Sequence, residues 1–157
     1  MDDFQRVADG LIIYKLRSAW FEIARIYNQL ALEYDVTLSM AFVLVALDEE
    51  EGTPVTKIAP RMGMEPNSLS RILKSMEQKG IVYRRKEEGD KRIVYICLTD
   101  KGAAYRRIAL RAVFRLEKEI VKEIPPEKMR HFFEVIAHIP KAISDFQEKL
   151  ETESIED

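Results

Sequence analysis

Three charged residues, Asp90, Lys91 and Arg92, form a short turn between two β-branched segments of the chain. An aspartate can orient a nearby arginine through a charge-assisted hydrogen bond, and the cations can hold phosphate oxygens or enter a minor groove. The flanking segments, 81–86 and 92–98, are typical of paired strands. The pattern therefore predicts a hairpin whose tip contacts a polyanion. A solvated turn with screened charges is the alternative.

A second set of polar and basic side chains recurs at helical spacing just before this hairpin. One face of the helix expected over 66–80 carries Asn67, Ser68, Ser70, Arg71 and Lys74. The opposite face is apolar, with Leu69, Ile72, Leu73 and Met76. In a DNA major groove, Asn67 can pair with adenine and Arg71 with guanine, while the serines bond bases or phosphates. An ordinary solvated helix face is the alternative.

Further residues are candidates for phosphate contacts. Arg84, Arg85 and Lys86 end the first expected strand. Thr37 and Ser39 stand at the start of an expected helix, where unpaired backbone N–H groups attract anions. Contacts of this kind position a protein on DNA without reading its sequence.

The charge distribution supports a local cationic surface. The chain of 157 residues has a net charge of −2, but residues 53–101 hold eleven Lys or Arg against six Asp or Glu. That middle third is therefore net +5 and the remainder net −7. A cationic patch on an otherwise acidic chain favours a polyanionic partner.

The elements expected to position these residues are mostly helices. Apolar residues at three- and four-residue steps predict a long helix over 10–33, and further helices are expected over 37–52, 56–63, 66–80, 102–125 and from 125 onward. Pro60 fits the helix over 56–63 only if it lies in the first turn, and Pro140 is expected to kink or divide the last helix. Thr99 is expected to cap the helix after the hairpin, and Gly102 to allow close packing there.

This order of elements predicts a mainly α fold with a small β-hairpin wing. Two short helices joined at a glycine and followed by a hairpin make a winged helix-turn-helix lobe, expected at 37–101. We expect helices of 1–36 and 102–157 to complete one composite domain and to form a twofold homodimer. The candidate apolar contacts of the dimer are Ile12, Ile120, Ile124, Phe132, Phe133, Ile136, Phe146 and Leu150.

In this arrangement the chain resembles the MarR family of bacterial transcription regulators. The wing and the next helix match the family pattern at Asp90, Arg92, Leu98, Thr99 and Gly102, and the approach to the wing matches at Lys79, Gly80 and Arg84. Pro60 and Glu65 depart from the pattern, at a helix-forming and a capping position respectively.

The resemblance implies a repressor that binds a pseudo-palindromic operator of double-stranded DNA as a homodimer. It also implies release by a small, often aromatic, effector in a crevice beside the winged lobe. Candidate residues for lining that crevice are Arg17, Trp20, Tyr27 and Arg111.

Other classes of function find little support. Phosphate-binding glycine loops, nucleophile elbows and His-Glu-x-x-His motifs are absent, so neither an enzyme nor a cofactor is expected. His131 and His138 lie about 10.5 Å apart along a helix, too far to share a metal. The single Cys97 excludes an internal disulfide and is expected to be a buried apolar residue.

Expectations for location and partners follow from the same composition. The acidic N-terminus and the lack of a long apolar run predict a cytoplasmic protein without membrane contact. A winged-helix module that binds another protein instead of DNA remains the second hypothesis.

Overall fold

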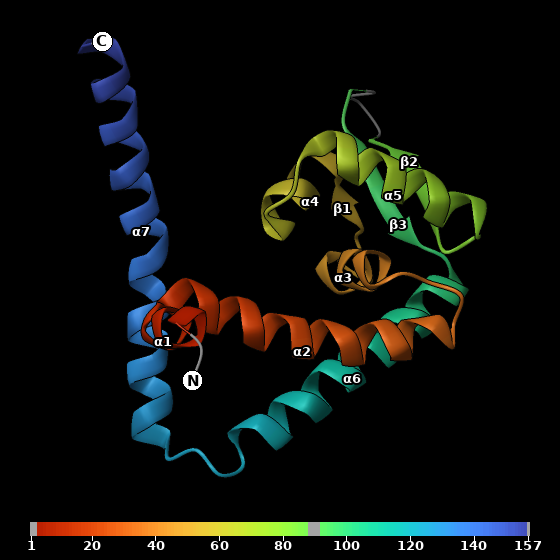
Figure 1. Ribbon diagram of the computed structural model, residues 1–157. Coiled ribbons are helices and arrows are strands. Elements are labelled where there is room, and N and C mark those ends of the chain that lie inside the picture. Colours follow the sequence, from red (N-terminus) through yellow and green to blue (C-terminus); the bar gives the residue numbers. More distant parts are fainter. Residues whose placement is uncertain (1–2, 88–91, 157) are drawn as a thin grey trace. The chain divides into compact units, whose positions relative to one another are not determined.

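The computed structural model describes residues 3–87 and 92–156 (Figure 1). The helices are α1 Asp3–Gly10, α2 Ile12–Leu32, α3 Leu38–Ala46, α4 Val55–Met62, α5 Pro66–Gln78, α6 Asp100–Val121 and α7 Pro126–Glu156. The strands β1 Thr53–Pro54, β2 Val82–Lys86 and β3 Val94–Leu98 form an antiparallel sheet in the order β1-β3-β2. The predicted mainly helical fold with a small wing sheet is confirmed. By packing, the chain divides into two units, 1–113 and 114–157.

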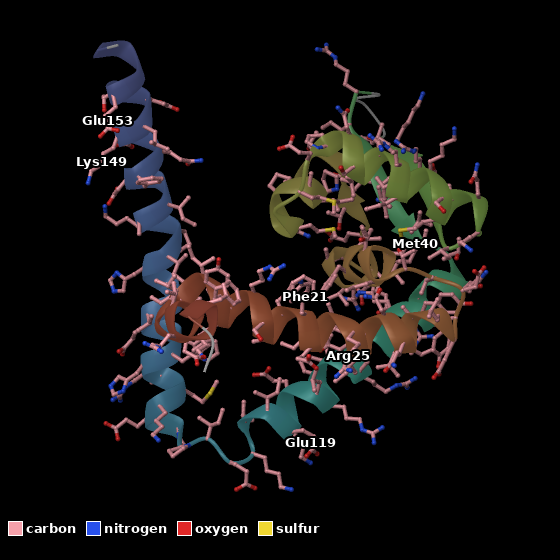
Figure 2. The ribbon with its side chains drawn as sticks, viewed as in Figure 1. Phe21, Arg25, Met40, Glu119, Lys149 and Glu153 are labelled. Carbon is pink, nitrogen blue, oxygen red and sulfur yellow. The ribbon has the colours of Figure 1, made fainter. Side chains whose placement is uncertain are left out.

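The hydrophobic core lies in the first unit, where α3, α4 and α5 pack with the sheet. Its fully buried apolar side chains come from every one of these elements: Val43, Leu44, Leu47, Ile58, Leu73, Met76, Ile81 and Ile96. Met40, labelled in Figure 2, adds to this core from the first turn of α3. Burial of a large apolar side chain contributes about 1.5–3 kcal/mol. This core therefore fixes the orientation of α5 and the hairpin.

Both helices of the helix-turn-helix pair end in a glycine with left-handed backbone. Gly63 has φ of 58° and Gly80 has φ of 65°. At each end, the N–H after the glycine bonds a carbonyl five residues back, Met64 to Ala59 and Ile81 to Met76. Such motifs satisfy the free carbonyl groups of a helix end and need a residue without a Cβ. The glycine stops predicted from the sequence are therefore confirmed.

Pro60 lies in the second turn of α4, six residues from its start, so the prediction that it must occupy the first turn is wrong. A proline there removes one backbone hydrogen bond. The helix nevertheless continues to Met62, because Ile58 and Ala59 are buried in the core and the glycine motif satisfies the last carbonyls.

The helix predicted over 37–52 ends six residues early, at Ala46. The carboxylate of Asp48 accepts hydrogen bonds from the backbone N–H groups of Glu50 and Glu51, which forms a turn instead of a further helical turn. The turn leads into β1, a third strand that the sequence did not predict. Its Thr53 is 2% exposed, and the Thr53 hydroxyl accepts a hydrogen bond from the Asp48 N–H.

The hairpin joins α6 through a close backbone contact. The Thr99 hydroxyl accepts a bond from the Gly102 N–H at 3.1 Å, and it also donates to the carbonyl oxygens of Gly80 and Ile81. A Cβ at Gly102 would lie 2.1 Å from the Ile81 carbonyl oxygen. The predicted cap and the predicted close packing are both confirmed. They fix the start of α6 against the turn that follows α5.

The long helices differ from the prediction in their breaks. A break at Leu11 separates α1 from α2. Within the second unit, α7 is one helix through Pro140, so of the predicted kink or division the division is wrong. In the part of the chain that the structure describes, no helix is both long and apolar enough to span a bilayer.

Candidate nucleic-acid interface and ligand cavity

The outer face of α5 is polar, basic and exposed. Leu69, Leu73 and Met76 are buried on its inner face, so the residues between them point outward. The five predicted recognition residues are all exposed: Asn67, Ser68, Ser70, Arg71 and Lys74. A helix packed by one apolar stripe thus presents the opposite face to a partner. The structure brings the predicted recognition residues together on that one face.

The N-terminus of α5 has no side-chain cap. Glu65 precedes Pro66 and makes no side-chain capping bond, as expected for the departure noted in the sequence. The Ser70 hydroxyl donates to the Pro66 carbonyl oxygen at 3.0 Å. Arg71 and Lys74 make no hydrogen bond or ion pair with another residue of the described ranges. Their charges are therefore available to an external partner.

The hairpin lies next to α5 in the lobe (Figure 1). A salt bridge links the two. The Arg84 guanidinium on β2 donates to the Glu77 carboxylate of α5 at 2.9 Å. In register, Arg84 pairs with Ile96, whose side chain is fully buried, so Arg84 lies on the inner side of the sheet. Arg84 thus holds the wing against the recognition helix.

Arg85, the next residue, is on the opposite side of the sheet. Its guanidinium donates to the Glu51 carbonyl oxygen at 2.6 Å and lies 4.9 Å from the Tyr95 ring centroid. A further hydrogen bond to the Cys97 side chain raises the pKa of Arg85. Cys97 is 6% exposed and lies against Gly52, so its predicted role as a buried residue is confirmed. Arg85 covers this part of the sheet.

The wing tip is described only at its base. Asp90 and Lys91 lie outside the described residues; Arg92 is exposed. At the base, the Glu87 N–H donates to the Ile93 carbonyl oxygen at 3.0 Å. The Tyr95 hydroxyl bonds the Glu87 carboxylate, which raises the pKa of Tyr95. Lys86, the last residue of β2, is exposed beside this base.

The N-terminus of α3 forms the remaining predicted phosphate site. Thr37 is exposed, and its hydroxyl accepts the Met40 N–H at 3.2 Å. Ser39 is half-buried in the first turn. The cap satisfies one of the free N–H groups at this end, and the others face the direction from which an anion can approach.

A network of charges joins α6 to the turn after α3, and the sequence analysis missed it. Glu49 accepts hydrogen bonds from Arg106 and Arg107, each at 3.0 Å, and Arg106 also donates to the Leu47 carbonyl oxygen. The partners lie more than fifty positions apart, so sequence spacing could not have indicated them.

A cavity of about 120 Å³ lies within the first unit among α2, α3 and α6. Its walls are mostly apolar: Tyr27, Leu30, Ala31, Glu33, Tyr34, Val36, Leu38, Ala41, Phe42, Leu44, Val45, Tyr105, Ile108, Ala109, Ala112 and Val113. The Tyr34 and Tyr105 rings meet edge to face, with centroids 5.6 Å apart, and Tyr27 meets Phe42 at 6.5 Å. Glu33 is the one charged residue among the described residues that line it.

Of the four residues predicted for an effector crevice, one lines this cavity. Tyr27 is on the wall. Arg17 instead lies over the Phe21 ring, 4.7 Å from its centroid, and Trp20 packs on Phe42 at 5.7 Å. Arg111 is exposed on α6. The sequence missed the aromatic residues that α3 and α6 contribute, because helices far apart in the chain bring them together.

The described residues contain no group of three or more His, Cys, Asp or Glu side chains placed to hold a metal ion. His131 and His138 are both exposed on α7. The cavity and the outer face of α5 are therefore the features to compare with known proteins.

Residues 36–94 match the model of the MarR family. The HTH-type transcriptional regulator SarZ of Staphylococcus aureus is 34% identical over 85 residues, which are 54% of this chain and 57% of SarZ. The chain thus spans little more than half the length of that relative.

Two solved structures share the fold over most of the chain. The S. aureus MepR–DNA complex has a TM-score of 0.79 at 18% identity and covers 86% of this chain and 98% of MepR. CouR from Rhodococcus jostii RHA1, bound to p-coumaroyl-CoA, has a TM-score of 0.75 at 20% identity and covers 84% of this chain and 93% of CouR. Together these findings show that residues 36–94 match the MarR family of transcription regulators and that the chain has the winged helix-turn-helix fold of the solved relatives.

Proposed function

We propose that this chain is a repressor that binds a pseudo-palindromic DNA operator as a homodimer and is released by a small effector. The observation that carries the proposal is the exposed face of α5, where Asn67, Ser68, Arg71 and Lys74 lie opposite a buried apolar stripe. A helix of this kind fits the major groove, where Asn can donate to adenine N7 and accept from adenine N6, and Arg can donate to guanine N7 and O6.

The wing and the lobe supply the contacts that position α5. Lys86 and Arg92 are exposed at the base of the hairpin, and the N-terminus of α3 offers backbone N–H groups to phosphate. The MepR relative was solved as a DNA complex, which supports the same partner here. The match of residues 36–94 to a family of transcription regulators argues against an enzyme.

The homodimer is supported by apolar residues on the long helices. Of the predicted contacts, Ile12, Ile120, Phe132, Phe133, Phe146 and Leu150 are exposed, and Ile124 and Ile136 are half-buried. Large exposed apolar patches mark interaction surfaces, and a twofold dimer places two recognition helices about one DNA turn apart. Sedimentation of a monomer at micromolar concentration would contradict this part of the proposal.

The effector site is the cavity among α2, α3 and α6. α6 lines it with Tyr105, Ile108 and Ala112, and the neighbouring Arg106 and Arg107 hold the turn after α3 through Glu49. A ligand that displaces α6 would therefore alter a contact of the DNA-binding lobe. CouR, bound to p-coumaroyl-CoA, is a relative in fold with a small-molecule ligand. A ligand shifts DNA affinity only as far as it prefers one of the two arrangements.

The test is fluorescence-anisotropy binding to the DNA upstream of the chain's own gene and to a scrambled duplex, across a salt series. We expect tighter binding to the native duplex and a steep loss of affinity with salt, since binding releases counterions. An absence of binding to either duplex at ~50 mM salt, where non-specific contacts still register, would favour the protein-interaction module instead.

A further inference from the structure

We propose that the cavity among α2, α3 and α6 selects a small aromatic cation over neutral and anionic molecules of the same size. This inference rests on the proposed role of the cavity as the effector site. It concerns only the chemical class of the ligand, which the family match leaves open.

The size of the cavity limits the part of the ligand that is enclosed. Its volume is about 120 Å³. An engineered apolar protein cavity of about 150 Å³ binds benzene. The enclosed part therefore corresponds to roughly one aromatic ring or a compact alkyl group. Anything larger must extend past the mouth of the cavity.

The aromatic walls favour a positive charge. Four rings line the cavity, those of Tyr27, Tyr34, Phe42 and Tyr105. The face of an aromatic ring is negative and attracts a cation, and cages of such rings recognise quaternary ammonium groups. A carboxylate placed against the same faces would be repelled and would also lose its hydration.

Two further features, a carboxylate and a helix end, also favour a cation. Glu33 is on the wall and exposed, which places its carboxylate where water still reaches the cavity. It directly follows the last residue of α2, Leu32, and the C-terminal end of a helix carries a partial negative charge. The carboxylate and the helix end therefore both stabilise a cation at the mouth of the cavity.

Lys101, which lies over one of these rings, is already engaged within the chain. Lys101 Nζ lies 5.5 Å from the Tyr105 ring centroid and donates to the Lys79 carbonyl oxygen at 2.9 Å. Lys101 is not on the cavity wall, and neither is any other Lys or Arg of the described residues. An anionic ligand would therefore lack a cationic partner inside the cavity.

The experiment compares three probes of similar size: benzyltrimethylammonium, its uncharged isostere neopentylbenzene, and phenylacetate. Binding is followed through the fluorescence of the single tryptophan, because Trp20 packs on Phe42 of the cavity wall. Calorimetry with the two charged probes gives an independent measure. We expect the cation to bind about tenfold more tightly than the isostere, and phenylacetate to bind most weakly.

Two variants assign the selectivity to the wall. Glu33→Gln should reduce the preference for the cation at least threefold while leaving the affinity for neopentylbenzene unchanged. Glu22→Gln is the control, because Glu22 is an exposed carboxylate of α2, the helix that Glu33 directly follows, and does not line the cavity. The control should retain the full preference.

The possible outcomes distinguish a failure of this inference from a failure of the proposed effector role of the cavity. Equal or tighter binding of phenylacetate or neopentylbenzene would overturn the charge selectivity and leave an effector cavity of another specificity. Failure of all three probes to bind would overturn the effector role of the cavity and this inference with it. Neither result changes the DNA-binding proposal, which the operator titration tests without any ligand.

Discussion

Two neighbouring parts of the winged lobe use the same kind of side chain in opposite ways. On α5, Arg71 and Lys74 are exposed and make no bond to another described residue. On β2, Arg84 bonds Glu77, and Arg85 bonds the Glu51 carbonyl oxygen and lies over Tyr95. The four cations are all exposed, yet only those on α5 are available to a partner.

The difference shows that a count of basic residues overestimates the number of cations in this lobe that are available to a nucleic acid. Part of the cationic surface holds the wing to the recognition helix and to the turn before β1. These intramolecular bonds give the sheet a fixed position next to α5, from which both would approach one duplex in the proposed DNA complex. Variants that remove one kind of cation at a time should therefore separate folding from DNA binding.

The largest effect is expected from disrupting the backbone contact between α6 and the turn that joins α5 to β2. Gly102→Ala would place a Cβ 2.1 Å from the Ile81 carbonyl oxygen, at the turn between α5 and β2. Helix propensity alone would favour alanine by about 1 kcal/mol. We nevertheless expect a net loss of about 3 kcal/mol in the free energy of unfolding, because backbone atoms cannot move aside cheaply.

Urea denaturation followed by circular dichroism measures this loss. Gly63→Ala is the comparison variant: Gly63 has a left-handed backbone, unlike Gly102, but a Cβ there meets nothing within 4 Å. It should cost only about 1 kcal/mol. If Gly102→Ala were as stable as wild type, the backbone at this contact would have to move to accommodate the added Cβ.

The next effect concerns recognition by α5. Arg71→Ala should weaken operator binding roughly 10- to 100-fold, which corresponds to the 1–3 kcal/mol of a bidentate base contact. Its midpoint of unfolding should not change, because Arg71 bonds no described residue. Anisotropy titrations with native and scrambled duplexes measure the loss, and Arg115→Ala on α6 is the control. An equal loss on both duplexes would assign Arg71 to phosphate instead of base.

For Arg85 on β2 we expect a smaller effect of the opposite kind, a loss of stability without a loss of DNA affinity. Arg85→Met should lower the thermal midpoint of unfolding, and by less than Gly102→Ala does. It should leave operator affinity within about twofold, because the Arg85 side chain makes its bonds within the lobe. Lys86→Met, one residue on, should leave the midpoint unchanged and reduce the salt dependence of binding by about one counterion. If Arg85→Met instead weakened DNA binding while stability held, the contrast between the two regions would be wrong.

The smallest effect is a pH dependence at the end of α5. The Lys79 ammonium bonds the Asp35 carboxylate and lowers the pKa of Asp35 below its ordinary value of 3.8. A carboxylate whose pKa is lower in the folded state contributes stability above its ordinary pKa, and this contribution is lost as pH falls through and below that value. The thermal midpoints of wild type and Asp35→Asn should therefore differ at pH 6 and converge near pH 3.

Asparagine is the suitable replacement because Asp35 has φ of 54°, a conformation that asparagine tolerates. The same comparison in a Lys79→Met background identifies the partner. A difference between pH 6 and pH 3 that persists in this background would assign the effect to a charge other than Lys79.

Several features were predictable because they depend on local chemistry. The apolar stripe of α5, the glycine stops at Gly63 and Gly80, and the Thr99 cap each involve residues within a few positions of one another. Helix period, left-handed backbone and capping are set by such neighbours. The sequence alone therefore determined the two short helices, the hairpin and the composition of the recognition face.

The end of α3, the strand β1 and the continuity of α7 through Pro140 were predicted wrongly or missed. Each depends on a competition that sequence periodicity does not include. Asp48 makes a turn where helix propensity alone would continue, and β1 is a strand of two residues because β3 lies beside it.

Only the tertiary structure decided which charges and rings meet. Glu49 finds Arg106 and Arg107 across the chain, Arg85 turns toward Glu51, and Tyr34 meets Tyr105 at the cavity. Contacts between distant positions arise from the packing of whole elements, and no local spacing encodes them. The sequence therefore determined which side chains can bind a partner, and the packing decided which of them remain free to do so.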